Sequence, residues 1–324
     1  MDATGLYRFL MTDVLEQPKA EQEPYYSLAD SLGGYAGALS NAAANANQHM
    51  TRLLSSGSGE AMDALGEHWN TVRTQKVQSV ADAGTRTTDV AREIADGIAA
   101  TKSQIVGIAS QCVQDVMAAQ AAAAFTFGAA EAAVLPAVQA AKSVSAQVVA
   151  KCNQHIASRL SLLQQDPAVA GLPDVAASLS GAASGGIAPA LAAGAAVAGA
   201  GGGGDAWGGA LPPGGGSGAG KGIEVDHAEH VRAAGALREV ATEAYGIPAG
   251  TVTPAAAQNG VGAGSGELGA AISATLGTVL DNLGKATTAF GDYLNGTLPD
   301  AVLRISGDQQ TTDDGNRNRF GRMD

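Results

Sequence analysis

The sequence predicts an all-α protein in which two antiparallel helical-hairpin units are joined by a Gly/Ala-rich linker. Apolar residues recur at steps of three and four over long stretches, which is the periodicity of a helix face. Apolar residues make up 45% of the chain but aromatic residues only 4%, so Ala supplies much of the apolar content. Because Ala favours helix and buries little area per residue, we expect long, thin hairpins rather than a thick core.

Residues 25–165 are expected to form the first helical domain, preceded by a short N-terminal arm at 1–24. The first helix has one apolar stripe, composed of Leu28, Leu32, Tyr35, Leu39, Ala42, Ala46, His49 or Met50, and Leu53. A Ser/Gly turn follows, where Ser58 is expected to cap the next helix. The second stripe begins at Met62, Leu65, Trp69 and Val72 and resumes at Ala91, Ile94, Ile98, Ile105, Ile108 and Cys112. This helix is expected to kink near Gly84, Gly107 or Gly128, and Pro136 to end or bend it.

Residues 166–222 are predicted to be a flexible linker, because a stretch of Ala and Gly cannot bury enough side-chain area to offset its ordering entropy. A second hairpin is expected at 223–307, opened by Asp226 and Glu229 as a capping box. A loop at 248–266 separates its two helices. The second helix has the cleanest stripe, formed by Leu268, Ile272, Leu276, Val279, Leu283, Ala286, Phe290 and Leu294. Residues 308–324 are expected to be a disordered tail.

The charge and composition exclude several classes of partner. A net charge of −12 argues against a nucleic-acid-binding protein and against docking on anionic lipid. Two apolar stretches, 117–141 and 175–204, are too rich in Ala and Gly for a membrane span. The first 17 residues mix charges into their apolar positions, so no classical signal peptide is expected. Cys112 and Cys152 are either two buried thiols, which is the favoured interpretation, or a disulfide formed when the chain folds back near Pro136.

No catalytic or cofactor-binding motif is recognisable, so the sequence predicts no enzyme, no cofactor and no metal site. His227 and His230 lie on one helix face beside Glu229, but these side chains make only half of a metal site. Capping and the helix dipole already explain the acidic residues there. The glycine-rich tract has neither a preceding strand nor the Gly-Lys-Ser/Thr of a phosphate-binding loop.

The first hairpin resembles the WXG family, the helical-hairpin substrates of actinobacterial type VII (ESX) secretion systems. Leu54-Ser55-Ser56 occupies the position of the Trp-x-Gly turn of that family, and Gly57 and Gly59 provide turn flexibility. Glu60-Ala61 and Trp69 stand where the family has Glu-Ala and a second aromatic residue. The resemblance covers about 25–112 and implies a turn and interface formed by Leu54, Gly57, Gly59, Glu60 and Trp69.

The C-terminal hairpin resembles a second group, the EspC-like ESX-associated proteins, through its opening at 223–229, its Gly-rich middle and the segment 290–294. Substrates of these systems have a Tyr-x-x-x-Asp/Glu export signal. Tyr26 and Asp30 have this spacing and share a helix face, which makes them the candidate export signal. The alternative interpretation makes Tyr26 a core contact and Asp30 a solvated residue.

The resemblance implies a type VII secretion substrate that acts as a helical protein-binding or carrier module. Its expected partners are the export ATPase and either a small WXG-like protein or further copies of itself. The protein would be cytoplasmic before export, and then secreted or at the cell surface by a route independent of a signal peptide. Two alternatives remain: a non-secreted helical scaffold or cell-envelope structural protein, and the delivery portion of a polymorphic toxin.

Overall fold

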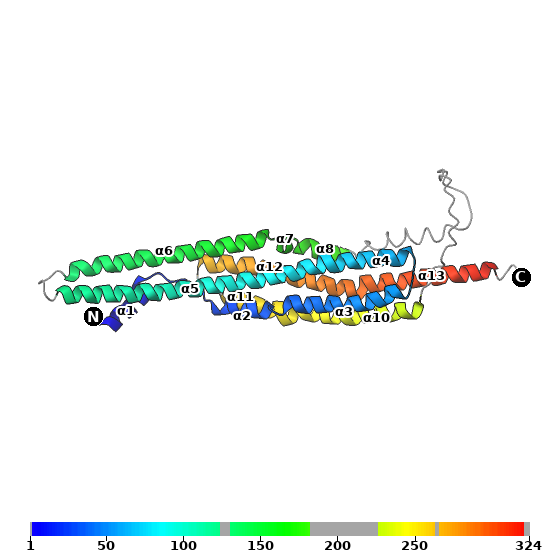
Figure 1. Cartoon of the computed structure of the whole chain (residues 1–324), viewed down its shortest axis with the longest axis horizontal. Helices are drawn as coiled ribbons and strands as arrows, with labels where there is room; N and C mark the ends of the chain where they lie inside the picture. The colour runs from blue at the N-terminus through cyan, green and yellow to red at the C-terminus, as the bar shows by residue number, and fades with distance from the viewer. Residues whose placement is uncertain (1, 124–129, 182–225, 263–265, 321–324) are drawn as a thin grey trace, which may run out of the picture. The chain divides into compact units, whose positions relative to one another are not determined.

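The computed structural model describes residues 2–123, 130–181, 226–262 and 266–320 (Figure 1). Every regular element in these ranges is a helix and none is a strand, which confirms the all-α prediction. Elements labelled η are π-helical turns. The elements are α1 (Ala3–Phe9), η1 (Leu10–Val14), α2 (Glu23–Leu32), α3 (Tyr35–Ser55), α4 (Glu60–Thr71), η2 (Val72–Val77), α5 (Gln78–Ala123), α6 (Ala130–Gln165), α7 (Pro167–Ala170), α8 (Leu172–Gly181), α10 (His227–Ile247), η4 (Pro248–Val252), α11 (Thr253–Gly262), α12 (Glu267–Asp292), η5 (Tyr293–Thr297) and α13 (Leu298–Phe320).

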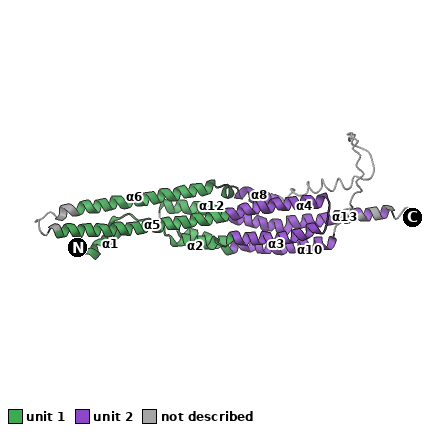
Figure 2. Cartoon of the chain, in the orientation of Figure 1, with its two compact units in different colours: residues 1–35, 83–170, 250–281 green, residues 36–82, 171–249, 282–324 purple. Residues whose placement is uncertain are grey.

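The chain divides into two compact units, each assembled from three separate segments (Figure 2). Unit 1 contains residues 1–35, 83–170 and 250–281. Unit 2 contains residues 36–82, 171–249 and 282–324. The domains expected at 25–165 and 223–307 do not coincide with these units, because helices distant in the sequence pack together within each one.

Unit 1 is built on the antiparallel pair α5 and α6. One ion pair joins the two helices, and a second joins α5 to Asp166, the residue that follows α6. Arg159 pairs with Glu93 at 2.8 Å and Arg86 with Asp166 at 3.6 Å. Helix α2 packs against α11, where the buried Tyr25 hydroxyl donates to the Gly262 carbonyl at 2.6 Å. Burial of the phenol raises the pKa of Tyr25 to about 12, because a charged phenolate would be poorly solvated there.

Unit 2 contains two antiparallel helix pairs. The first is α3 with α4, which are adjacent in sequence. In the second, α10 runs beside the end of α12, η5 and α13. This second pair is held by Tyr245 Oη donating to Asp292 at 2.7 Å and by an ion pair of Arg238 with Asp300 at 3.1 Å. The sequence predicted that the helix with the stripe from Leu268 to Leu294 would pack against α10. The residues that contact α10 instead lie at about 292–306.

Three segments expected to be irregular are helical. Within the expected linker, α7 and α8 cover most of residues 167–181, because Val169, Leu172 and Leu179 find buried positions there. The expected loop at 248–266 contains η4 and α11, which bury Val252 and Ala255. The expected tail belongs to α13 as far as Phe320. The rest of the expected linker lies outside the described residues.

Several expected helix boundaries also differ. Ser58 does not cap α4; the N-cap is Gly59, at φ +125°, with no side-chain hydrogen bond. Helix α5 continues through Gly84 and Gly107, and α6 contains Pro136 in its interior, whereas Gly128 lies outside the described residues. The expected cap at Asp226 is confirmed, since its carboxylate accepts from the backbone N–H groups of Ala228 and Glu229. Glu229 does not complete the capping box, because its side chain pairs with Arg232 instead.

The two cysteines are free and buried, which resolves the two interpretations in favour of unbridged thiols. The Cys152 thiol donates to the Gly97 carbonyl of α5 at 3.5 Å. Cys112 lies 15 residues further along the same helix, which is about 22 Å at the helical rise. The two sulfur atoms are therefore too far apart for a disulfide.

Close packing of Tyr35 against α5 within unit 1 requires the glycine at position 84. A Cβ atom there would overlap the buried Tyr35 ring. We expect Gly84→Ala to lower the free energy of unfolding by about 1–3 kcal/mol, the usual cost of overpacking, as measured by urea denaturation. Gly107→Ala is the matched control, because a Cβ on that residue of α5 would meet nothing within 4 Å and Ala is the better helix former. Equal stability of the two variants would contradict this packing.

Candidate protein-recognition site

The chain reverses direction between α3 and α4 at residues 56–59. Helix α3 ends at Ser55, and the Ser56 N–H and hydroxyl both bond to the Leu53 carbonyl. Gly59 then adopts φ +125°, which L side chains rarely tolerate. Its carbonyl accepts from Met62 and Asp63 and so starts α4. The turn predicted from Gly57 and Gly59 is therefore present, and Gly59 is the residue that requires glycine.

Trp69 holds the two helices of this hairpin side by side through its burial and its hydrogen bond to Asn47, a contact called the Trp69 lock below. Its side chain lies on α4 and is only 2% exposed. The indole Nε1–H donates to Asn47 Oδ1 on α3 at 3.0 Å. Residues 69 and 47 lie at similar distances from the turn, as antiparallel helices require. The indole thus contributes both apolar burial and a satisfied hydrogen bond, which a buried N–H needs.

The other residues predicted for the turn lie around this lock. Leu54 is half-buried and faces Gly66, where a Cβ would stand 3.3 Å from the leucine Cδ1. Glu60 is the first residue of α4 and is exposed, where its charge complements the helix dipole. Asn47 and Gly66 were not predicted from the sequence. The sequence shows Asn47 as a polar residue on an Ala-rich helix face and Gly66 as a glycine inside a helix. Neither feature identifies a contact until the fold is known.

A hollow of about 530 Å³ lies beside Asn47, between α3 and η2. Its walls are mostly polar, and the residues with polar side chains are Ser40, Asn47, Gln48, Arg73, Thr74 and Gln78. This surface adjoins the Trp69 lock and offers hydrogen-bonding groups of both kinds. This hollow was not predictable from the sequence, because its residues come from two segments about 30 positions apart.

Next to Trp69, the His68 ring faces the ring of Tyr293 in η5. The rings of His68 and Tyr293 have centroids 6.0 Å apart. His68 Nε2, Tyr293 Oη and Thr297 Oγ1 are buried without a hydrogen-bond partner among the described residues. Burial, and to a smaller extent the charge of Lys76, lowers the pKa of His68. Burial alone raises the pKa of Tyr293. Both side chains are therefore held in their neutral forms.

Tyr26 and Asp30 lie on the surface of unit 1, one helical turn apart on α2. The Tyr26 hydroxyl donates to Asp96 at 2.5 Å and Asp30 pairs with Arg92 at 3.4 Å. The hydrogen bond to Asp96 raises the pKa of Tyr26. Asp30 is 77% exposed, as the solvated interpretation requires. Tyr26 is only half-buried, however, and the buried tyrosine of α2 is its neighbour Tyr25.

The histidines at the start of α10 have structural partners. His227 Nδ1 lies 2.6 Å from Ser306 Oγ, and His230 Nδ1 donates to the Asp226 carbonyl at 2.9 Å. Within the described residues, no three His, Cys, Asp or Glu side chains are grouped so as to hold a metal ion. In the same part of the chain, no helix combines the length and the hydropathy that a bilayer crossing needs.

No family model, no curated protein and no solved structure matches the chain.

Removing the indole should weaken the hairpin more than removing its hydrogen bond alone. We expect Trp69→Ala to lower the free energy of unfolding by about 3–5 kcal/mol, the usual cost of deleting a buried tryptophan side chain. Trp69→Phe keeps most of the apolar contact but leaves the Asn47 oxygen unsatisfied, so its cost should be about 1–3 kcal/mol. Urea denaturation followed by circular dichroism measures both, and equal losses would contradict the separate contribution of the ring.

The stability of unit 2 should fall as the pH decreases below the ordinary His68 pKa of 6.5. The folded state lowers this pKa, so the unfolded chain binds the proton first, and the loss accumulates between pH 6.5 and the lower folded value. The free energy of unfolding is measured by urea denaturation over a series of pH values. The loss at low pH should disappear in the His68→Gln variant and remain in the His49→Gln variant on α3. An identical pH dependence in the wild type and the His68 variant would contradict the assignment.

Proposed function

We propose that the protein is a type VII (ESX) secretion substrate that acts as a helical protein-binding or carrier module. The protein leaves the cell as a folded hairpin or as a complex. Its recognition elements are the α3–α4 turn, the Trp69 lock and the pair Tyr26 and Asp30. Two features support this role: the sequence resemblance, and a helical hairpin of fixed shape that a receptor for folded helices can bind.

The observation that carries the proposal is the Trp69–Asn47 lock. A receptor that reads helices must be offered them in a fixed register. A buried indole with a satisfied N–H restricts the sliding of α4 along α3, because sliding by one turn would break the hydrogen bond and expose the ring. The Ser/Gly turn is thereby presented at one end of a rigid pair of helices.

The pair Tyr26 and Asp30 supports a role in export through its position. Both side chains are partly or largely accessible, and both are oriented by contacts to α5 rather than left mobile. An aromatic ring and a carboxylate one turn apart form a compact epitope on a helix. Such preorganisation lowers the entropy that a receptor must remove on binding.

The partners proposed are the export ATPase and either a small WXG-like protein or a further copy of this chain. The hollow beside Asn47 and the exposed turn provide polar surface for such contacts. In this proposal the protein is cytoplasmic before export, and then secreted or located at the cell surface.

Export by cells with and without the type VII machinery tests the proposal. The wild-type chain should reach the medium only when the machinery is present. Tyr26→Ala combined with Asp30→Ala should reduce export about tenfold, because the loss of one charged hydrogen bond at a receptor costs at least about 1.4 kcal/mol. Asp89→Asn, an exposed carboxylate on α5, is the matched control and should be exported normally.

Each variant must retain the helical circular dichroism of the wild type, so that a folding defect is not scored as an export defect. Retention of the wild-type chain inside cells that have the machinery would contradict secretion and favour the helical-scaffold alternative. Normal export of the double variant would contradict the role of Tyr26 and Asp30 alone.

A further inference from the structure

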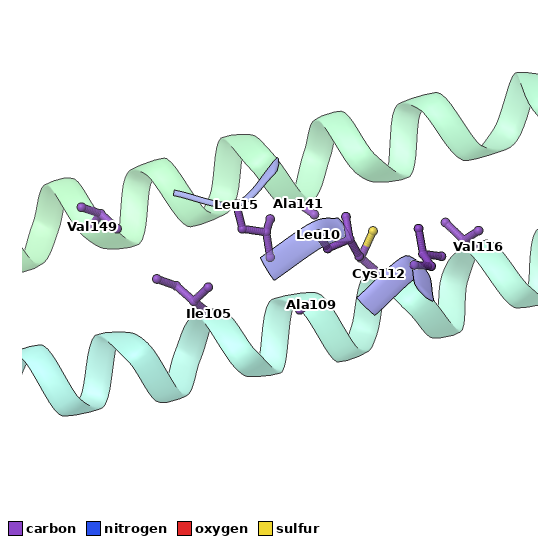
Figure 3. Packing of buried hydrophobic residues seen from close by; sticks show 9 residues of the cluster. Leu10, Leu15, Ile105, Ala109, Cys112, Val116, Ala141 and Val149 are labelled. Carbon is purple, nitrogen blue, oxygen red and sulfur yellow. The ribbon is translucent and has the colours of Figure 1, made fainter. Parts of the chain in front are cut away.

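The first part of the N-terminal arm, residues 2–16, lies in a groove between α5 and α6 of unit 1 (Figure 3). Helix α1 and turn η1 place Leu6 and Leu10 in this groove, and Leu15 follows just after. The groove itself is lined by Ile105, Ala109, Cys112, Val116, Ala141 and Val149. The arm therefore provides an amphipathic helix whose leucines fill the seam of a helical hairpin.

Polar contacts between this arm and its groove are sparse. In the described part of the chain, the one hydrogen bond between them joins the Glu16 N–H to Ser145 Oγ at 3.2 Å, and no ion pair joins the two. The next polar anchor is at residues 21 and 22, where Glu21 and Gln22 both accept from Lys102. Apolar contact is thus the main attraction, and it is non-directional.

The segment between the arm helix and this Lys102 anchor can act as a hinge. Residues 15–20 are not helical, and Pro18 restricts the residue before it to extended backbone. Because Leu15 and Glu16 belong to the groove contacts, only residues 17–20 can change direction, and four extended residues span about 13 Å. The arm can therefore leave its groove and reach a neighbouring molecule while Glu21 and Gln22 stay bound to Lys102.

Apolar side chains remain exposed on the helices that form the occupied groove. These residues lie on α1, α5 and α6 and keep between 41% and 64% of their surface: Phe9, Val106, Met117, Leu135 and Val144. A second molecule brought to this region would cover part of that surface. The groove also fits the arm of a second copy as well as its own, because the two arms have the same sequence.

We propose that the groove between α5 and α6 is an exchangeable helix-docking site, and that its partner is the arm of a second copy of this chain. Two molecules exchange residues 2–16, and each exchanged arm makes in the partner the contacts that it makes in its own chain. The monomer and the exchanged dimer then share the same groove contacts, so concentration decides between them. This inference does not depend on export.

Cysteine cross-linking between two different full-length chains tests the exchange. Both chains have Cys112→Ala and Cys152→Ala. One adds Glu16→Cys, and the other adds Ser145→Cys with a C-terminal tag that changes its size. The 3.2 Å contact places these residues within reach of a disulfide. Mixing, oxidation and a non-reducing gel should give a mixed dimer whose yield rises with protein concentration.

A control pair gives the yield of disulfides that form by random collision. In this pair the Glu16→Cys chain is mixed with a Thr242→Cys chain, whose thiol lies on an exposed face of α10. The exchanged pair should exceed this yield about tenfold. Adding Leu6→Asp and Leu10→Asp to the Glu16→Cys chain should reduce the yield to that of the control pair.

Two outcomes would overturn the proposal. The first is a mixed dimer no more abundant than that of the control pair at any concentration. The second is a mixed dimer that is unaffected by the two aspartates. A single chain that has both Glu16→Cys and Ser145→Cys should form an internal disulfide at low concentration, which shows that the two thiols can react. Failure to form it would contradict the position of the arm in its own groove.

Discussion

The hydrogen bond from the buried Trp69 indole to Asn47 is the interaction on which the recognition surface depends. Ala-rich helices bury little area and therefore define their mutual register weakly. A single large side chain with a directional N–H removes that ambiguity. The turn at Gly59, the exposed Glu60 and the hollow beside Asn47 all take their positions from the register that this contact sets.

The few aromatic residues of the chain are used in the same way elsewhere. Tyr35 lies over Gly84 and Tyr25 over Gly262 in unit 1, and Tyr245 lies over Gly291 in unit 2. In all three pairs a Cβ on the glycine would come within 2.9 Å of the ring. In each case a tyrosine covers the missing side chain of a helical glycine. Large rings packed on bare backbone supply the shape complementarity that alanine stripes lack.

The apolar stripes were predictable from the sequence because each is local. Leu28 to Leu53 and Ile272 to Leu294 are buried largely as the three-and-four spacing requires, although Leu268 is only half-buried. Which segments of the chain pack together in each unit was not predictable. The contact of Tyr25 with Gly262, for example, joins residues that are 237 positions apart. Helices α7, α8 and α11 were missed since composition suggested loops, whereas tertiary burial of Leu172, Leu179 and Ala255 stabilises helix there. In the candidate site, the turn and Trp69 followed from the sequence, but Asn47 and the partners of Tyr26 and Asp30 depended on helices brought together by the fold.

Hydrogen exchange at the Trp69 indole N–H tests the central structural claim most directly. The resonance can be assigned by its absence from the Trp69→Phe chain, and its exchange followed by NMR in deuterated buffer. A buried N–H bonded to Asn47 should exchange only when the hairpin opens, so that protection falls sharply in the Asn47→Ala chain. Exchange at the rate of a free indole in the wild-type chain would show that the two helices are not locked by this residue.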